Sequence, residues 1–550
     1  MHNFTQLIAA LAAALAVHSV FLFIKSRFFS PIRDLPGPRG SSWIFGSLKD
    51  ISKNEEAVTQ EQWVQQYGRT YKYPAFLNKN ILFTLDHKAL NHVLMHHYVY
   101  QKHDASRFHF TRIVGPGLLV AEGDHHKLQR RVMNPAFGPA PVRDLTETFI
   151  DKSLELKDVW SSQIVNGGGT AKINALDSIS KMTLDVIGRV GFNYEFDTLK
   201  ESGESNKLAQ AFATIFGDLD MEKAKYQPWT VLQTLFPILR ALPPVKIPGL
   251  DSAQETMAKI GQELLHESKK ALQNSGDDLK SKDLLTLLVK SNMNGEPSQR
   301  MSDRDVLAQI PTFLVAGHET TRQVPTNLES KPQATYLPAG TTWALFGLVQ
   351  HQDVQKKLRE ELRTMATDNP TMEQLNLLPY LDAVVKESLR LYAPVPSVLR
   401  VAAQDDVIPL SHPLKDNKGV EHHSISIAKG QTVIVPLLAL NRDKATWGED
   451  AMEFKPERWE RVPAAATSVP GVWGHMMTFL GGPRACIGYR LSLIEMKALL
   501  FVLVREFEFE LAVPSEEIIK KTMIVQRPRV RSEPEGGTQL PLLVRACQKD

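Results

Sequence analysis

The chain is poor in cysteine and nearly balanced in charge, and each shortage excludes a class of protein. Only 2 cysteines occur among 550 residues, which excludes a small secreted scaffold held together by disulfides. The formal net charge of +3 is too small to indicate a nucleic-acid partner. Internal repeats and long low-complexity linkers are also missing from the sequence. One large domain is therefore expected rather than the roughly three that length alone would suggest.

One long hydrophobic run is present, close to the N-terminus. Leu7 to Ile24 is almost wholly apolar, and about 18 residues are just enough to span a bilayer as a helix. No lysine or arginine precedes this run, and Lys25 and Arg27 follow it. The positive-inside rule therefore predicts a single-pass anchor with the rest of the chain in the cytosol. The alternative is a cleaved signal peptide, which would favour a basic start and a small-residue cleavage site.

A second feature is a decapeptide near the C-terminus. Residues 479–488 read F-L-G-G-P-R-A-C-I-G, which is the pattern F-x-x-G-x-R-x-C-x-G. Its fixed positions would coincide by chance with a probability of about 10⁻⁴ in a chain of this length. A cysteine that ligates iron must be deprotonated and shielded, and a tight loop with amides aimed at the sulfur favours that state. The pattern predicts Cys486 as the thiolate ligand of a haem iron, and the alternative is a buried cysteine in a glycine-rich turn.

The neighbours of Cys486 have predicted roles in the same loop. Gly482 and Gly488 supply conformational freedom. Arg484 can reach a haem propionate, and Phe479 can shield the sulfur.

This loop resembles the proximal haem-binding signature of the cytochrome P-450 monooxygenases. The resemblance implies a mainly α fold with a small β-sheet subdomain, haem b as cofactor, and oxidation of a hydrophobic small molecule with O2. It also implies NADPH-cytochrome P-450 reductase as the electron donor, cytochrome b5 as a second partner, and no nucleic acid. Leu35-Pro36-Gly37-Pro38 resembles the family's hinge. The expected organisation is an endoplasmic reticulum anchor over 1–27, a hinge over 28–40 and a cytosolic catalytic domain over 41–550.

Other motifs of the family follow in the expected order. Glu387-Ser-Leu-Arg390 matches E-x-x-R, and its two charged residues share one face of an expected helix. Phe454–Trp459 is similar to the P-E-R-F segment, whose arginine, here Arg458, is implied to brace Glu387 in a buried structural network. A surface ion pair is the alternative for an E-x-x-R motif taken by itself.

Three further residues are implied to hold the haem propionates. The segment 123–131 resembles the family's W-x-x-x-R helix, with His126 in place of the tryptophan and Arg130 as the arginine. Arg400, which follows Pro394 and Pro396 in the sequence, is the third candidate. A solvated surface charge is the alternative at each of these positions.

The motif expected to carry oxygen chemistry is Ala316-Gly-His-Glu-Thr320, which matches A-G-x-[DE]-T. The resemblance implies that Glu319 and Thr320 deliver protons during O2 activation. Ala316 and Gly317 would leave room for O2 beside the helix. A polar patch at the end of a helix is the alternative.

The helix should continue beyond this motif, but residues 323–338 contain three prolines, which exclude a continuous helix. The family's usual continuation reappears at Trp343. Joining Arg322 to Ala339 would restore both the family spacing and the helical period. We therefore hypothesise that 323–338 is a short in-frame intron retained in the sequence, and a genuine looped insertion is the rival explanation.

Three functions remain compatible with these residues. The leading one is a monooxygenase of fungal secondary metabolism or xenobiotic oxidation, since Val132–Phe137 and His126 resemble fungal members of the family. The second is a haem-thiolate isomerase or dehydratase, although such relatives usually alter the acid-alcohol pair. The third is a membrane-anchored haem-binding protein without turnover because of the 323–338 insertion. The substrate and the site of oxidation do not follow from the sequence.

Overall fold

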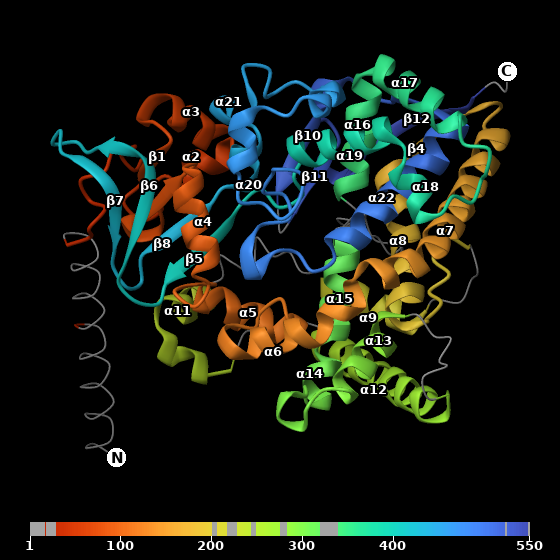
Figure 1. Ribbon diagram of the computed structural model, residues 1–550, viewed down its shortest axis with the longest axis horizontal. Helices are drawn as coiled ribbons and strands as arrows, with labels where there is room; N and C mark the ends of the chain where they lie inside the picture. The colour runs from red at the N-terminus through yellow and green to blue at the C-terminus, as the bar shows by residue number, and fades with distance from the viewer. Residues whose placement is uncertain are drawn as a thin grey trace. The chain divides into compact units, whose positions relative to one another are not determined.

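The computed structural model describes Val17 and residues 29–200, 206–216, 228–243, 249–275, 283–319, 339–522 and 525–547. The chain divides into two compact units, and its course is coloured from red to blue in Figure 1. Unit 1 comprises Met1–His103, Pro396–Gly448 and Ala465–Arg484, and unit 2 comprises Asp104–Val395, Glu449–Ala464 and Ala485–Asp550. The expected mainly helical architecture with small sheets is confirmed. A single catalytic domain over 41–550 stays a prediction.

Unit 1 is built on a mixed sheet with the strand order β1-β2-β8-β5-β3, in which β2 and β8 are parallel and the other neighbours are antiparallel. The strands are β1 (Thr70–Pro74), β2 (Asn80–Thr84), β3 (Tyr100–Gln101), β5 (Val398–Ala402) and β8 (Thr432–Val435). A separate hairpin pairs β6 (Asp406–Lys415) with β7 (Glu421–Ile427). Its helices are α2 (Leu48–Lys53), α3 (Val58–Tyr67), α4 (His87–Met95), α20 (Leu437–Asn441) and α21 (Lys444–Trp447).

The central strands of this sheet follow from apolar runs in the sequence. β2 buries Ile81, Leu82 and Phe83 in succession, as a strand covered on both faces requires. β2 and β8 fall within the stretches Lys79–Leu85 and Gly430–Leu437, which are rich in β-branched or aromatic residues.

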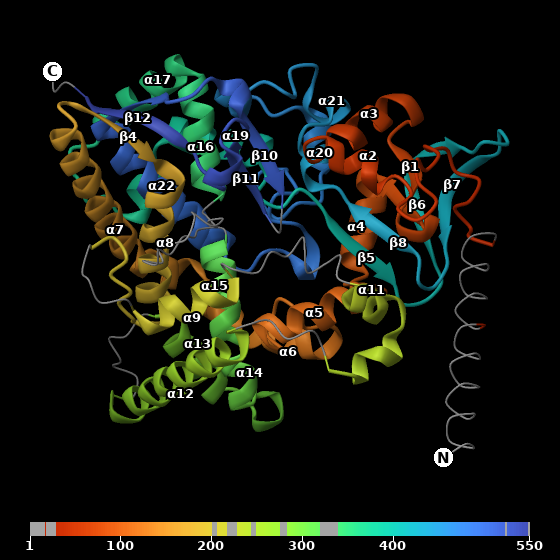
Figure 2. The same cartoon turned by 180° about the vertical axis from the view of Figure 1, so that it is seen from behind.

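Unit 2 contains most of the helices. They are α5 (Asp104–Val114), α6 (Gly123–Met133), α7 (Pro139–Asn166), α8 (Ala175–Phe192), α9 (Lys207–Phe216), α11 (Pro228–Leu235), α12 (Leu250–Ser275), α13 (Leu284–Met293), α14 (Asp303–Leu307), α15 (Gln309–Glu319), α16 (Ala339–Gln350), α17 (Gln352–Arg363), α18 (Met372–Asn376), α19 (Pro379–Leu391) and α22 (Tyr489–Glu506). Figure 2 shows α12 passing beside α9 and α13.

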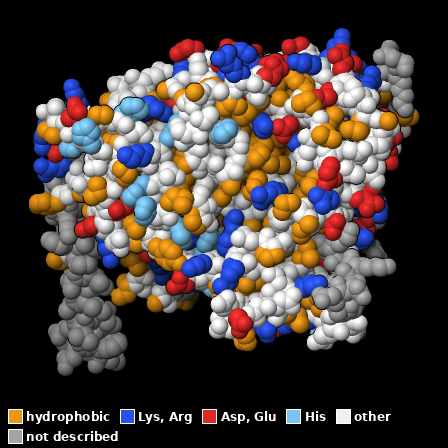
Figure 3. Space-filling view, viewed as in Figure 1, with side chains coloured by type: hydrophobic (Ala, Val, Ile, Leu, Met, Phe, Trp, Pro, Cys, Tyr) orange, Lys and Arg blue, Asp and Glu red, His pale blue; other side chains and the backbone are white. Residues whose placement is uncertain are grey.

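Two small antiparallel sheets complete unit 2. One has the order β4-β12-β9, from β4 (Thr170–Asn174), β12 (Pro541–Ala546) and β9 (Phe507–Leu511). The other pairs β10 (Ile518–Thr522) with β11 (Gln526–Val530). On the face of the molecule seen in Figure 3, acidic, basic and hydrophobic side chains are interspersed.

The core of unit 2 is organised around α22, which packs against α7, α17 and α19. Apolar residues occur all around α22, and Leu499, Leu500 and Leu503 are fully buried. A helix that is hydrophobic on every side belongs in a core. Because α22 begins directly after the Cys486 loop, this core fixes the position of the predicted iron ligand.

The E-x-x-R helix, α19, has a strongly defined start. Pro379 occupies its first position, where the missing N–H is not needed. The Glu361 carboxylate accepts hydrogen bonds from the backbone N–H groups of Tyr380 at 2.7 Å and Leu381 at 2.8 Å. These contacts satisfy two donors that a helix start leaves free.

The expected central helix consists of two described helices, α15 and α16, and residues 320–338 lie outside the described part of the chain. Both helices pack on α8. In α16 the buried Trp343 ring stacks on Tyr392 at a centroid distance of 5.5 Å and donates to the Gln526 carbonyl oxygen at 3.1 Å. The residue at which the sequence pattern resumes, Trp343, therefore anchors α16 in the core.

The predicted anchor over 1–27 falls almost entirely on residues that the structure does not describe. Within the described ranges, none of the helices combines the length and apolar character that a bilayer crossing needs. The anchor stays a prediction.

Deletion of Gln323–Pro338 should increase the amount of correctly bound haem. Each proline inside a helix costs about 3 kcal/mol, and the deletion joins two segments that already pack as helices. We expect a reduced carbon monoxide difference spectrum of microsomes to show a several-fold larger red-shifted Soret band for the deletion variant than for the full chain. The band should vanish when Cys486→Ser is added. Equal bands from the two forms would identify 323–338 as a tolerated loop.

Candidate active site

The predicted iron ligand lies just before the buried helix α22. The backbone N–H of Gly488 donates a hydrogen bond to the Cys486 sulfur. Burial raises the pKa of the Cys486 thiol, whereas this hydrogen bond and the nearby Arg130 guanidinium act in the opposite direction. Protein atoms lie close to the sulfur, but part of the Cys486 side chain is exposed. A thiol with an amide donor, a nearby cation and an open approach suits a metal ligand.

The first half of the loop belongs to unit 1 and passes very close to other backbone atoms. Gly482 has a φ of +66°, and a Cβ there would lie 2.9 Å from the Leu94 carbonyl oxygen. A Cβ on Gly481 would lie 1.7 Å from the Pro470 carbonyl oxygen. Glycine is therefore required at both positions. Sequence reasoning missed Gly481, and the Gly-Gly pair was the available signal.

The remaining members of the signature differ in their surroundings. Gly488 has a φ of −90°, which any residue adopts, and a Cβ there would lie 3.8 Å from Phe137. Gly488 therefore contributes the backbone N–H at the Cys486 sulfur, and the predicted need for conformational freedom at this position is wrong. In unit 1, Phe479 packs edge-on against Trp473 with a centroid distance of 5.7 Å.

Arg130 connects α6 to the cysteine loop within unit 2. Its Nη1 donates to the Ala485 carbonyl oxygen at 2.5 Å, and its Nε donates to Asn134 Oδ1 at 2.9 Å. Burial lowers the pKa of the Arg130 guanidinium, and the nearby Cys486 opposes this shift without cancelling it. His126 lies buried on the same helix. Arg130 therefore holds the backbone directly before Cys486 in place.

Two other predicted propionate ligands belong to unit 1. Arg400 is buried on β5 and donates from Nη1 to the Leu399 carbonyl oxygen at 2.9 Å. Arg484 ends the short 3₁₀ helix η8 (Gly482–Arg484). Propionate binding by Arg130, His126, Arg400 and Arg484 stays a prediction.

The predicted proton-delivering residues fall at the edge of the described chain. Glu319 is the last residue of α15, and its side chain is not among the described ones. Thr320 lies outside the described residues. Their proposed role therefore rests on the sequence motif.

The E-x-x-R pair is fully buried and forms two parallel hydrogen bonds. Arg390 Nε donates to Glu387 Oε2 at 2.9 Å, and Arg390 Nη2 donates to Glu387 Oε1 at 2.8 Å. The side chains of both residues are 0% exposed. Arg390 also donates to the carbonyl oxygens of Ala451 at 2.6 Å and Glu453 at 3.1 Å. The pair thus ties α19 to the segment after α21.

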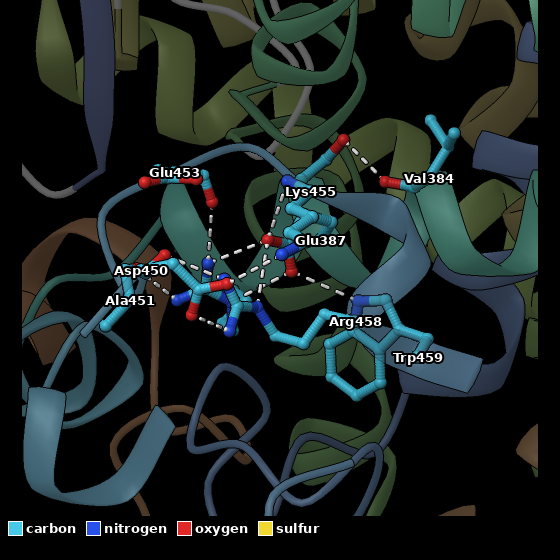
Figure 4. A network of polar contacts seen from close by, with 10 residues as sticks. Val384, Glu387, Asp450, Ala451, Glu453, Lys455, Arg458 and Trp459 are labelled. Atoms are coloured by element: carbon cyan, nitrogen blue, oxygen red, sulfur yellow. Dashed lines mark hydrogen bonds and ion pairs between the residues drawn. The ribbon is translucent and has the colours of Figure 1, made fainter. Parts of the chain in front are cut away.

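Arg458 joins this network mainly through a residue that sequence reasoning missed (Figure 4). Its Nη1 donates to Asp450 Oδ1 at 2.6 Å, and its Nη2 donates to the Asp450 carbonyl oxygen at 2.7 Å. The contact from its Nε to Glu387 Oε1 is longer, at 3.4 Å. The expectation that Arg458 braces Glu387 is therefore incomplete. Arg458 and Lys455 hold the pKa of Asp450 down to about 2.

Two further donors reach the Glu387 carboxylate from the same segment. The Trp459 indole N–H donates to Oε2 at 3.1 Å, and the Lys455 backbone N–H donates to Oε1 at 3.0 Å. Trp459 stands where the family motif has phenylalanine, and its N–H is the added feature. Both carboxylate oxygens are thus satisfied by several donors, as a buried charge requires.

Sequence reasoning also missed Glu495 on α22. Burial raises the pKa of Glu495 to about 8. Its Oε1 is buried and has no hydrogen-bond partner among the described residues. A carboxylic acid in such a place stays protonated at neutral pH because burial disfavours its charged form. An acid in the apolar pattern of a core helix was the available signal.

Asp450→Asn should weaken the network because a charge-assisted hydrogen bond to Arg458 is lost, with a cost of about 1–3 kcal/mol. Since the folded pKa of Asp450 lies below its ordinary value of 3.8, its stabilisation is complete above about pH 4 and is lost as the pH falls towards 2. Thermal unfolding of Asp450→Asn should therefore show a lower Tm than wild type at pH 7. The Tm difference between the two proteins should be smaller at pH 3.5. Asp368→Asn is the control, since that carboxylate is 82% exposed. An equal loss in both variants would contradict this role.

Glu495→Gln should stabilise the protein at alkaline pH. The folded pKa of Glu495, about 8, lies above its ordinary value of 4.5. The contribution of this carboxyl group to stability is therefore most favourable below pH 4.5 and falls as the pH rises towards 8. Glutamine does not ionise, so the variant lacks this decrease of stability with rising pH. The Tm difference between variant and wild type should therefore grow from pH 5 to pH 8.5 in calorimetry. The exposed Glu516→Gln should show no such growth, and a flat difference for Glu495→Gln would refute the burial argument.

Comparison with known proteins places these features in one family. The family model for cytochrome P450 matches residues 35–531. Cytochrome P450 monooxygenase 205 of Postia placenta is 49% identical over 542 residues, which cover 97% of this chain and 96% of the relative. Cytochrome P450 monooxygenase 128 of the same organism is 48% identical over 554 residues, covering 99% and 98%. Cytochrome P450 monooxygenase claQ of Ampulloclitocybe clavipes is 35% identical over 544 residues, covering 96% and 97%.

The donor set described above fits the cofactor of that family. An accessible cysteine with an amide at its sulfur, and an arginine that fixes the preceding carbonyl, match what a haem iron requires of a thiolate ligand. The chain belongs to the cytochrome P450 family, a family of haem b monooxygenases with relatives in fungi.

Proposed function

We propose that this protein is a microsomal haem-thiolate monooxygenase that hydroxylates or epoxidises a hydrophobic small molecule. Its electrons come from NADPH through cytochrome P-450 reductase, with cytochrome b5 as a second donor. Its role lies in fungal secondary metabolism or xenobiotic oxidation. The observation that carries this proposal is the Cys486 loop, with the Gly488 amide at the sulfur and Arg130 at the Ala485 carbonyl oxygen.

The chain's own residues have separable tasks in this function. The bound haem supplies the redox chemistry of O2 activation. Cys486 would hold its iron through the sulfur, and the Gly488 N–H favours the thiolate over the thiol. Arg130 fixes the loop backbone, and Arg400 and Arg484 are the proposed propionate partners with His126.

Proton delivery is assigned to Glu319 and Thr320. A threonine hydroxyl can accept one hydrogen bond and donate another, so it can pass a proton from a carboxylic acid towards the reacting oxygen. The order acid then alcohol in Ala316–Thr320 is unaltered in this chain. This intact pair favours monooxygenation over the isomerase or dehydratase alternative.

The proposed substrate is hydrophobic because the segments implied to contact it are mainly apolar. They are Phe108–Val120, Ala209–Pro248, Val398 and Met523–Val525. Parts of the second and fourth of these lie outside the described residues. Apolar pockets with a few polar groups are typical of small-molecule sites.

The reductase surface is proposed to include the basic end of α6. Arg131 is exposed there, and Lys127 lies one turn before it. An acidic partner would be steered towards such a surface. The proposed location is the endoplasmic reticulum membrane with the body in the cytosol, supported by the run Leu7–Ile24 and the cations after it.

A second candidate function is favoured by one observation. The described helices α15 and α16 are separated by residues that include three prolines. In the chain as written, this interruption directly follows Thr320. A haem-binding protein without turnover is therefore the alternative for a translated chain that contains residues 323–338.

Thr320→Ala tests the monooxygenase assignment. The variant should bind haem normally but release at least several-fold more hydrogen peroxide per NADPH consumed, because protons no longer reach the reacting oxygen in the correct order. The measurement uses reconstituted reductase and a hydrophobic compound selected by its spectral shift on binding. The neighbouring Thr321→Ala is the matched control. Unchanged peroxide release in Thr320→Ala would refute the proton-delivery role.

A further inference from the structure

The first half of the cysteine loop, residues 479–484, packs against the C-terminal end of α4 within unit 1. A Cβ on Gly482 would lie 2.9 Å from the Leu94 carbonyl oxygen and 3.3 Å from the Met95 sulfur. A Cβ on Gly481 would lie 3.5 Å from Leu94 Cδ1. The backbone of the loop therefore lies directly on the last turn of α4, with no room for a side chain between them.

The backbone of this part of the loop adopts a conformation that needs such support. Leu480 has a φ of +57°, which is disfavoured for a residue with a side chain. Its N–H donates to the Met477 carbonyl oxygen at 2.8 Å, and its own carbonyl oxygen accepts from the Val472 N–H at 2.9 Å. A disfavoured conformation persists only where the surrounding structure holds it in place. Loosening of α4 would therefore loosen the loop.

The position of α4 is set by two carboxylates that connect it to strand β6, on which it packs (Figure 1). At the start of the helix, Asp86 Oδ1 accepts from the Ala89 N–H at 2.9 Å, and Asp86 Oδ2 accepts from the Ser411 N–H at 2.8 Å. In the last turn, His92 Nε2 lies 2.8 Å from Asp406 Oδ2. Both ends of α4 are thus tied to the same strand.

The contact of His92 with Asp406 is the one close to the loop, since His92 is two residues before Leu94. The Tyr100 hydroxyl also donates to Asp406 Oδ2, at 2.7 Å. Partial burial raises the pKa of Asp406, but the hydrogen bonds from His92 and Tyr100 outweigh this effect and hold the pKa below its ordinary value. Asp406 is therefore ionised at neutral pH and can only accept hydrogen bonds, so His92 Nε2 carries the proton that it donates.

We propose that His92 and Asp406 are positioning residues for the haem thiolate, because their hydrogen bond fixes the end of α4 on which the cysteine loop lies. Arg484, the last residue of η8, is two residues before Cys486. A shift of the supported segment is therefore passed along the backbone to the sulfur. This inference rests on the haem-thiolate ligation of the proposed function, and it adds a contact outside the signature to the groups that control that ligation.

Hydrogen exchange and the reduced carbon monoxide difference spectrum of the full-length protein test this role. His92→Phe keeps a ring on α4 but removes the donor to Asp406. Peptides that contain Leu480 should exchange five- to ten-fold faster than in wild type. The fraction of the carbon monoxide complex that lacks the red-shifted Soret band should rise at least three-fold, because the thiolate is less well placed.

Substitution of the acceptor provides a rescue test. Asp406→Leu should reproduce both effects of His92→Phe, since neither His92 nor Tyr100 then has its acceptor. Asp406→Asn should keep exchange and spectrum within about two-fold of wild type, because its amide oxygen still accepts hydrogen bonds. Equal effects of Asp406→Asn and Asp406→Leu would contradict the proposal.

His87→Phe is the matched control on the same helix. His87 begins α4 and contacts Ser468 at 2.6 Å and Thr446 at 3.2 Å rather than β6. This variant should leave exchange at Leu480 and the spectrum unchanged. Equal effects of the two histidine variants, or wild-type exchange at Leu480 in His92→Phe, would overturn the positioning role. Exchange does not require haem, so it decides this role even if wild type lacks the red-shifted band, which would refute the proposed function instead.

Discussion

The buried carboxylate of Glu387 is the constraint on which the arrangement around α19 depends. A charge with no exposure to water must be neutralised and hydrogen bonded, and leaving it unpaired costs about 3–5 kcal/mol. Arg390 neutralises it, while the Trp459 indole and the Lys455 amide supply the remaining donors. The segment 450–459 must therefore return to α19. A requirement of one carboxylate thus fixes the course of this segment within unit 2.

The cysteine loop is held by contacts of a different kind. Gly481 and Gly482 allow its first half to approach backbone atoms more closely than any side chain would permit. In the second half, Arg130 binds the Ala485 carbonyl oxygen and the Gly488 amide reaches the sulfur. Close backbone approach and directed hydrogen bonds both reduce the freedom of Cys486. A ligand whose geometry is fixed before the metal binds loses less entropy on binding.

Interrupted helices and small residues explain the less regular parts of unit 2. The packing of α15 on α8 and the buried Trp343 of α16 anchor the two described helices separately. Between α12 and the start of α15, Gly261 allows a close approach, since a Cβ there would lie 3.1 Å from Ile310 Cδ1.

The sequence by itself determined the family, the candidate iron ligand and the E-x-x-R pair, because these depend on residue types at short, fixed spacings. It also located the break after Thr320, since proline cannot donate a backbone hydrogen bond. Only the tertiary structure brought Asp450 to Arg458 and showed that the Glu495 carboxyl group is buried in a core helix. Asp450 and Arg458 are only eight residues apart, but they meet across an irregular segment whose course no helical or strand period predicts. The apolar pattern marks Glu495 as an acid in a core helix, but its charge state depends on everything packed around it.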